Sequence, residues 1–207
     1  MPAHFELFNT FITKYVEFND DEVTNFSSKC TKVEFPKSAF IMKAGEVQKN
    51  LYFTTEGIIR NYIENNKGEI KIFNFRSESM VVTGYASYNY EDNLKSLVNV
   101  QCLEDCVLIK VPFDAINYVI NHIKLGDRLG RFMAEAHVVQ MIQYVIQRDT
   151  MSIIERLDNI DKNFPNIHQR VPQYMIASYL GITPVHLSNL KKRRNPKSEP
   201  TNLSARP

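Results

Sequence analysis

The sequence contains no tryptophan, only three cysteines and seven glycines among 207 residues, and no long apolar run. A membrane-spanning helix needs about 18 or more consecutive apolar residues, so no membrane span is expected. The opening MPAHFELF lacks a basic segment followed by an apolar core, so we expect no secretion signal and predict a cytoplasmic protein. Cys30, Cys102 and Cys106 form no CxxC pair, which argues against zinc and iron–sulfur sites and favours buried thiols.

Groups for catalysis are scarce as well. The five histidines all lie outside the β-prone middle of the chain, whereas a β-roll metalloenzyme needs histidines clustered on its strands. They are His4, His122, His137, His168 and His186. No nucleophile stands at a recognisable spacing from a general base. We therefore expect no enzymatic activity, no metal and no cofactor.

The middle of the chain, from Cys30 to about Pro112, alternates short β-prone runs with turn signals. Such regular short strands predict an antiparallel barrel or roll. The expected strands are Lys32–Phe35, Ala39–Met42, Leu51–Thr55, Ile58–Glu64, Ile70–Phe75, Leu97–Cys102 and Val107–Val111. Two helices are expected before them, one over 5–17 and one opened by a capping box of Asn19 and Glu22.

After Pro112 the apolar spacing becomes helical, and helices are expected over 113–123, 125–147 and 151–162. The longest of them repeats residues at alternating steps of four and three, with one polar exception. These residues are Leu125, Leu129, Phe132, Ala136, Val139, Gln143 and Ile146. The spacing is typical of a seam between two helices and favours a homodimer. A helix packed on its own β-roll would use a similar stripe, so that alternative stays open.

The segment 171–194 has the pattern of two short helices joined by a tight turn. Gly181 supplies the backbone freedom for the turn, and Thr183-Pro184 supplies an N-cap and a first helical residue for the second helix. The small, turn and inward-facing positions of a helix-turn-helix are Ala177, Gly181, Leu187 and Leu190. A second helix of this kind fits the major groove of DNA, with its N-terminal residues at base edges.

The charge of the chain is uneven. Residues 168–207 carry seven Lys or Arg and one acid, which gives a net charge of +6. Because the whole chain has a net charge of +2, the preceding 167 residues have a net charge of −4. A basic module on an acidic body is typical of a nucleic-acid-binding protein, although a helical hairpin with a solvated basic end gives the same sum. The predicted DNA-binding residues are Arg170, Thr183, Pro184, Val185, His186, Ser188, Asn189, Lys191, Lys192, Arg193 and Arg194.

A β-roll, a long helix and a helix-turn-helix in this order resemble the Crp/Fnr regulators. The resemblance rests on LYFTTEGIIRNY at 51–62, KAGE at 43–46 and QRVPQYMIASYLGITPVHLSNL at 169–190. It implies an α+β fold with an antiparallel β-roll of the cyclic-nucleotide-binding type (a double-stranded β-helix), a long dimerisation helix and an all-α, winged-helix-like DNA-binding domain. It also implies a bacterial transcription regulator that binds double-stranded DNA as a homodimer, with RNA polymerase as a further partner.

The corresponding division of the chain is a β-roll domain over 1–123, a dimerisation helix over 124–148, a helix-turn-helix domain over 149–195 and a disordered basic tail over 196–207. No wing is expected after the second helix of the helix-turn-helix, because Asn195-Pro196 ends it and no strand pair remains.

The expected effector pocket departs from the family pattern. Relatives bind the ribose with a Gly-Glu pair and the cyclic phosphate with an Arg-Ser or Arg-Thr pair. Here Gly84-Tyr85 and Lys95-Ser96 stand in those places. Tyrosine lacks the carboxylate, and lysine lacks the planar fork of arginine, so we expect an unidentified effector, or none, and not cyclic AMP.

The second helix of the helix-turn-helix departs as well. Val185 and Asn189 stand where relatives present an acid and an arginine. A β-roll module that has lost specific DNA binding is therefore the alternative function.

Overall fold

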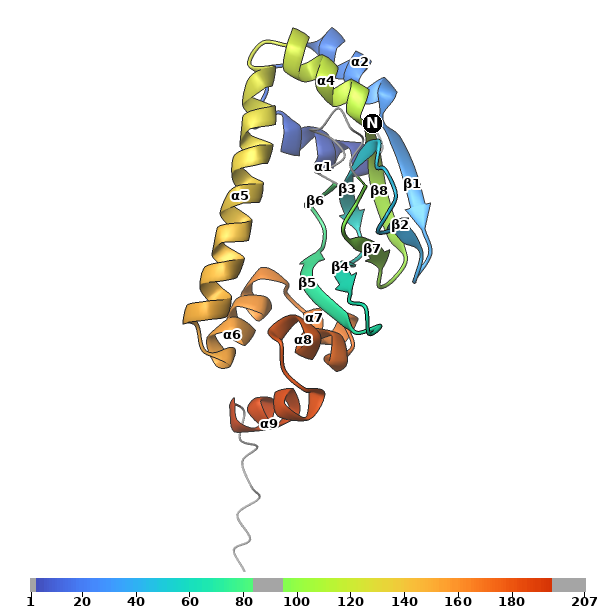
Figure 1. Cartoon of the computed structure of the whole chain (residues 1–207). Helices are drawn as coiled ribbons and strands as arrows, with labels where there is room; N and C mark the ends of the chain where they lie inside the picture. The colour runs from blue at the N-terminus through green and yellow to red at the C-terminus, as the bar shows by residue number, and fades with distance from the viewer. Residues whose placement is uncertain (1–2, 84–94, 195–207) are drawn as a thin grey trace, which may run out of the picture.

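The structure is a computed structural model that describes residues 3–83 and 95–194 (Figure 1). Its first two helices are α1 (Ala3–Ile12) and α2 (Asp20–Lys29). The predicted capping box of α2 is confirmed, because the Glu22 N–H donates to Oδ1 of Asn19 and the Asn19 N–H donates to Oε2 of Glu22, each at 2.9 Å. Phe8 of α1 packs against Phe26 of α2, and so fixes both helices to one hydrophobic core.

The strands form two four-stranded antiparallel sheets, ordered β1-β8-β3-β6 and β2-β7-β4-β5. They are β1 (Thr31–Phe35), β2 (Phe40–Met42), β3 (Asn50–Glu56), β4 (Ile59–Glu64), β5 (Ile70–Arg76), β6 (Val81–Thr83), β7 (Asn99–Cys102) and β8 (Cys106–Pro112). The predicted antiparallel roll is confirmed. Within the described ranges, β6 was not among the expected strands.

The two sheets close over a shared apolar interior that holds the thiols of Cys102 and Cys106, and Cys30 lies in the neighbouring core with the N-terminal helices. All three thiols are buried, as the sequence predicts. The turn between β3 and β4 requires glycine. Gly57 has φ of +103°, and a Cβ there would lie 2.5 Å from Sγ of Cys106 and 2.9 Å from the carbonyl oxygen of Asp105. The tight approach joins the two sheets at the end of the roll that faces the C-terminal helices.

Two helices follow the roll, α4 (Phe113–His122) and α5 (Gly126–Thr150). The first half of α5 packs on its own chain: Leu129 is 2% exposed, and the ring of Phe132 stacks on Tyr15 with centroids 3.9 Å apart. The second half of α5 extends past the roll toward the C-terminal helices (Figure 1). None of the helices in the described part of the chain is long and apolar enough to cross a membrane.

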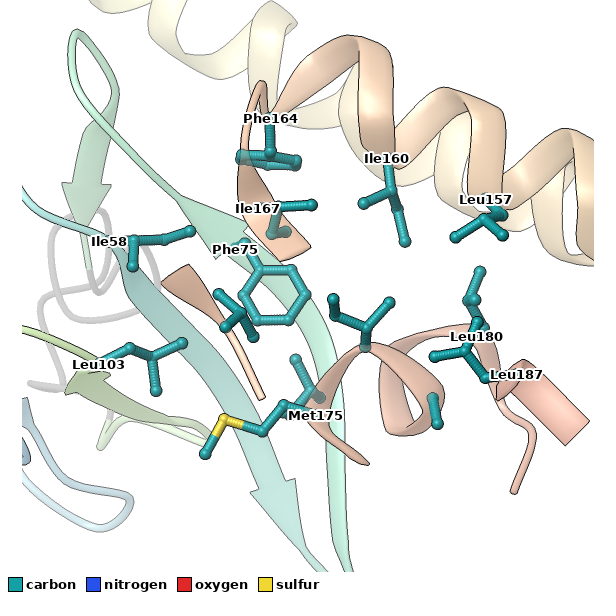
Figure 2. Close-up of a cluster of buried hydrophobic side chains, with 14 of the residues drawn as sticks. Ile58, Phe75, Leu103, Leu157, Ile160, Phe164, Ile167, Met175, Leu180 and Leu187 are labelled. Carbon is teal, nitrogen blue, oxygen red and sulfur yellow. The ribbon is translucent and has the colours of Figure 1, made fainter. Parts of the chain in front are cut away.

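The C-terminal helices dock on the roll and share a core with it. They are α6 (Ile153–Asn163), α7 (Ile167–Arg170), α8 (Gln173–Leu180) and α9 (Pro184–Arg194). Figure 2 shows Phe75 of β5 among side chains of α6, α7 and α8. The Ser178 hydroxyl donates to the Ile70 carbonyl and accepts from the Ile72 N–H, each at 3.2 Å. The helix-turn-helix segment is therefore held against the edge strand of one sheet.

Candidate nucleic-acid interface and effector pocket

The turn between α8 and α9 has the geometry that the sequence predicts. Gly181 adopts φ of +71°, which a residue with a side chain rarely adopts, and its N–H donates to the Ser178 carbonyl at 3.1 Å. The Ile182 N–H reaches the Ala177 carbonyl at 3.0 Å. Ala177 is 1% exposed, so its small side chain lies inside the helix pair. These contacts close a short turn between α8 and α9.

The second helix buries one face and leaves the opposite face open. The Oγ1 atom of Thr183 accepts from the His186 N–H at 3.2 Å, so Thr183 caps α9 as expected. Leu187 and Leu190 are buried, whereas Val185 is 70% exposed. The predicted base-contacting and capping residues lie on the open side, with Ser188 half-buried and the others exposed: Thr183, Pro184, Val185, His186, Asn189.

The four basic residues that end α9 divide into two groups. Lys192 and Arg193 are exposed, and neither forms an ion pair with any residue in 3–83 or 95–194. Arg194 instead pairs with Asp158 at 2.8 Å and with Asp161 at 2.7 Å, both on α6. The sequence gives no sign of these pairs, because the acids lie more than thirty residues earlier in the chain.

Lys191 belongs to the second group. Its Nζ lies 2.8 Å from Nδ1 of His168, while Nε2 of His168 lies 2.8 Å from Oδ1 of Asp161. Burial and the Lys191 charge lower the pKa of His168 below its usual value, against the opposing effect of Asp161. Burial also lowers the pKa of Lys191. A neutral His168 can therefore accept a hydrogen bond from the Lys191 ammonium.

Arg170 lies at the contact between the roll and the C-terminal helices. Its guanidinium binds Oε1 of Glu78 at 2.7 Å and also binds the carboxylate of Glu104. The hydrogen bonds that Arg170 donates to Glu78 and Glu104 raise the pKa of Arg170. The sequence predicts Arg170 as a DNA contact from its charge alone, but the structure directs its side chain to two carboxylates of the roll. Its contact with DNA stays a prediction.

The apolar residues of α5 fall into two groups, one packed against the same chain and one exposed. Leu129 and Phe132, predicted for a dimer seam, pack on the N-terminal part of their own chain. Leu125 occupies the N-cap position of α5. Farther along, α5 exposes six apolar residues, which we call the α5 stripe: Val138, Val139, Met141, Ile142, Val145 and Ile146. Val139 and Ile146 belong to the predicted seam, and the exposed Gln143 lies between them. The sequence assigned neither Val138 nor Met141 to it.

Of the four predicted effector residues, two belong to the part of the chain that the structure describes. Gly84 and Tyr85 lie outside the described residues, and Lys95 is exposed. Ser96 is buried, and its hydroxyl donates to the Val98 carbonyl at 2.8 Å and accepts from the Val98 N–H at 3.1 Å. Both contacts stabilise the turn before β7, and the role of Ser96 toward an effector stays a prediction.

A cavity of about 200 Å³, which we call the roll cavity, lies between the roll and α5. Arg76 lines it and donates from Nη2 to Oε1 of Gln140 at 2.9 Å, and burial lowers the pKa of Arg76. Burial, together with Arg76, also lowers the pKa of His137, which lines the same cavity from α5. The sequence did not single out Arg76, because one arginine in a strand forms no motif. No group of three or more potential metal ligands occurs in the described ranges.

No protein-family profile and no curated protein matches this sequence. Solved structures match it by fold. FixK2 from Bradyrhizobium japonicum is 16% identical, with 79% of this chain and 83% of that chain covered and a TM-score of 0.67. A regulator assigned to the Crp/Fnr family from Eubacterium rectale is 14% identical, with 92% and 86% covered and a TM-score of 0.67.

CLP from Xanthomonas campestris, a c-di-GMP-responsive global regulator, is 13% identical, with 85% and 91% covered and a TM-score of 0.58. The chain therefore has the fold of the Crp/Fnr regulators, with a cyclic-nucleotide-binding-like roll followed by C-terminal helices.

Proposed function

We propose that this protein is a bacterial, cytoplasmic transcription regulator of the Crp/Fnr family that binds double-stranded DNA as a homodimer. The observation that carries the proposal is the α8–α9 pair. Its turn at Gly181 is tight, and its inner face is buried. Its outer face carries polar and small side chains beside Lys192 and Arg193, which form no ion pair with the described residues. A surface of this kind fits the major groove and the phosphates on either side of it.

The residues of α9 have separate roles in this proposal. Lys192 and Arg193 contact phosphates, which hold the protein on DNA without reading its sequence. Asn189 pairs with adenine, and Val185 contacts a thymine methyl group, so sites rich in A·T pairs are favoured. Lys191 and Arg194 contribute less, because His168 and acids of α6 already bind them.

The α5 stripe supports the homodimer. Six apolar residues within about two and a half turns of one helix form an exposed apolar patch. Their steps of three and four suit packing against a second copy of the same helix. A two-fold pair of chains would present two α9 helices to two half-sites.

The roll cavity is the proposed place of an effector other than cyclic AMP, bound near Arg76. RNA polymerase is the proposed partner through which a bound dimer acts, and this suggestion rests on the family resemblance alone.

Selection of binding sites from random DNA at fixed salt tests the proposal. The wild type should select a motif, and Asn189→Ala should relax it at one position, at a cost of about 1–3 kcal/mol against the preferred base. Lys192→Gln should leave the motif unchanged and weaken all duplexes alike, with the salt slope reduced by roughly one unit. Lys14, an exposed lysine just after α1, provides the matched control, and Lys14→Gln should change neither property.

Two results would contradict the proposal. If the wild type selects no motif and shows no salt-sensitive binding, DNA is not the partner, and the roll acts as an interaction module. If Lys192→Gln changes the motif while Asn189→Ala does not, the two roles are reversed.

A further inference from the structure

Another cavity, of about 600 Å³, lies between the roll and the C-terminal helices, and we call it the interdomain cleft. Strands β4 and β7 and the turn before β2 form one wall, and α7 with the first turn of α8 forms the other. Small-molecule sites in proteins have volumes of roughly 300–1,000 Å³. The cleft is therefore large enough for a metabolite, and it is separate from both α9 and the roll cavity.

The roll wall presents a guanidinium that neutral groups hold in place. Nε and Nη2 of Arg60 donate to Oε1 of Gln101 at 3.1 and 2.6 Å. Gln101 in turn donates from Nε2 to the Ser38 carbonyl at 2.9 Å, and the Arg60 guanidinium lies 4.4 Å from the centroid of the Tyr62 ring. This network orients Arg60 without neutralising its charge.

A second cation, Lys37, borders the same wall. Across 3–83 and 95–194, neither Arg60 nor Lys37 forms an ion pair. Two carboxylates near the cleft, Glu78 and Glu104, already bind Arg170, and no acid lines the cleft. Charge-assisted bonds from an oriented arginine and a lysine are the usual means of holding a phosphate.

The opposite wall is suited to an uncharged ring. Tyr174 is 57% exposed at the start of α8, and Gln169 and Gln173 lie beside it. An aromatic face can stack on a planar ring, and glutamine amides can both donate to and accept from its polar edge. The two walls together offer cations on one side and a stacking surface with amides on the other.

We propose that the interdomain cleft binds a phosphorylated small molecule of nucleotide size, with its phosphate on Arg60 and Lys37 and its ring against Tyr174. Because the walls belong to the roll and to the C-terminal helices, the ligand links the two and stabilises the docked position of α8. Ligand binding in the cleft requires no DNA, so this proposal can be tested separately from the proposed DNA binding.

Isothermal titration calorimetry of the full chain without DNA tests the proposal, with ADP, AMP and pyrophosphate as probes. We expect saturable binding of ADP, weaker binding of pyrophosphate, and a loss of about ten- to a hundredfold in ADP affinity for Arg60→Gln. Lys37 lies on an exposed turn, so Lys37→Gln should reduce the ADP affinity without affecting folding. This variant keeps the test valid if Arg60→Gln fails to fold. Tyr174→Ala should weaken ADP but not pyrophosphate.

Three control variants locate the bound probe. Lys14→Gln should bind ADP as the wild type does. Arg76→Gln tests the roll cavity, and a Lys192→Gln, Arg193→Gln double variant tests the basic end of α9; both should keep the wild-type affinity. Absence of saturable binding for all three probes would overturn the proposal, and so would a loss of affinity confined to Arg76→Gln or to the α9 variant.

Discussion

His168 lies between a basic residue near the end of α9 and an acidic residue of α6. Its ring lies between the Lys191 ammonium and the Asp161 carboxylate, and Asp161 also binds Arg194. Protonation of His168 would remove the lone pair that accepts from Lys191 and place a second positive charge beside it. The neutral ring is therefore the form that this cluster stabilises, in agreement with the lowered pKa.

Stability should consequently depend on pH at this residue. Because the pKa of His168 is lower in the folded protein, the unfolded chain binds more protons as pH falls from about 6.5 toward the folded pKa. The free energy of unfolding should decrease as pH falls through that window. Above the window, titration of His168 should contribute no further change with pH. Urea denaturation of the wild type and His168→Gln from pH 8 to pH 5 measures the difference. His137 contributes with the same sign, so His137→Gln is the control that keeps the share of His168. Parallel curves for the wild type and His168→Gln would contradict this interpretation.

Gly181 supports a prediction of a different kind. A Cβ at Gly181 would meet nothing within 4 Å, so any cost of a side chain comes from the positive φ and not from a clash. Gly181→Ala should destabilise the protein by about 1–2 kcal/mol. Gly181→Asn should cost less, because asparagine adopts the left-handed conformation more readily. Thermal unfolding of both variants checks the order, and an equal loss in both would point to a packing effect.

At the scale of elements, most of the fold follows from local patterns. The strands, the capping box at Asn19, the Gly181 turn and the Thr183 cap all depend on residues near one another in the chain. The division of the apolar residues of α5 into a buried group and an exposed group does not follow from such local patterns. A repeat of four and three specifies an apolar face but not what covers it, and here the N-terminal part of the chain covers Leu129 and Phe132 while the α5 stripe stays exposed.

The α5 stripe gives the prediction that belongs to this scale. Ile142→Glu with Val145→Glu should dissociate the proposed dimer, since burying unpaired charge in an apolar seam costs several kcal/mol, and should leave the fold intact because both residues are exposed. Sedimentation velocity with circular dichroism measures both properties. Phe132→Glu should instead disrupt the monomer, because Phe132 stacks on Tyr15.

Ile154→Glu changes an exposed apolar residue outside the stripe and is the matched control, which should remain dimeric. A wild type that sediments as a monomer at micromolar concentration would remove the basis for this prediction.

At the scale of the whole molecule, the contacts that set the position of α9 join distant parts of the chain. Ser178 bonds β5 across more than a hundred residues, and Arg170 pairs with Glu78 and Glu104 of the roll. Such pairs have no signature in the sequence, because either partner alone is an ordinary surface residue. The sequence therefore predicts the helix-turn-helix and its open face, but not which basic residues are already bound by acids. The sequence does not predict the interdomain cleft either, because the residues of its two walls are far apart in the chain.

The position of α8 and α9 should determine the spacing of the half-sites that a dimer recognises. Half-sites of two-fold dimers lie about 34 Å apart, one turn of DNA, and in the proposed dimer the docked C-terminal helices would set that distance. Arg170→Ala removes the ion pairs with Glu78 and Glu104 and should loosen the docking. Affinity for a single half-site should then stay within about twofold, whereas affinity for paired half-sites should fall and the preference for one spacing should flatten.

A DNA contact from Arg170 leads to a different result. If Arg170 binds a phosphate, as its charge alone predicts, Arg170→Ala should weaken single and paired half-sites alike and reduce the salt slope by roughly 0.9. A Glu78→Gln, Glu104→Gln double variant separates the two explanations, because it weakens the same docking contact while Arg170 keeps its charge. Loss of spacing preference in both variants, with an unchanged salt slope, would assign Arg170 to docking. An unchanged spacing preference in the glutamine variant, with a reduced slope for Arg170→Ala, would assign it to DNA.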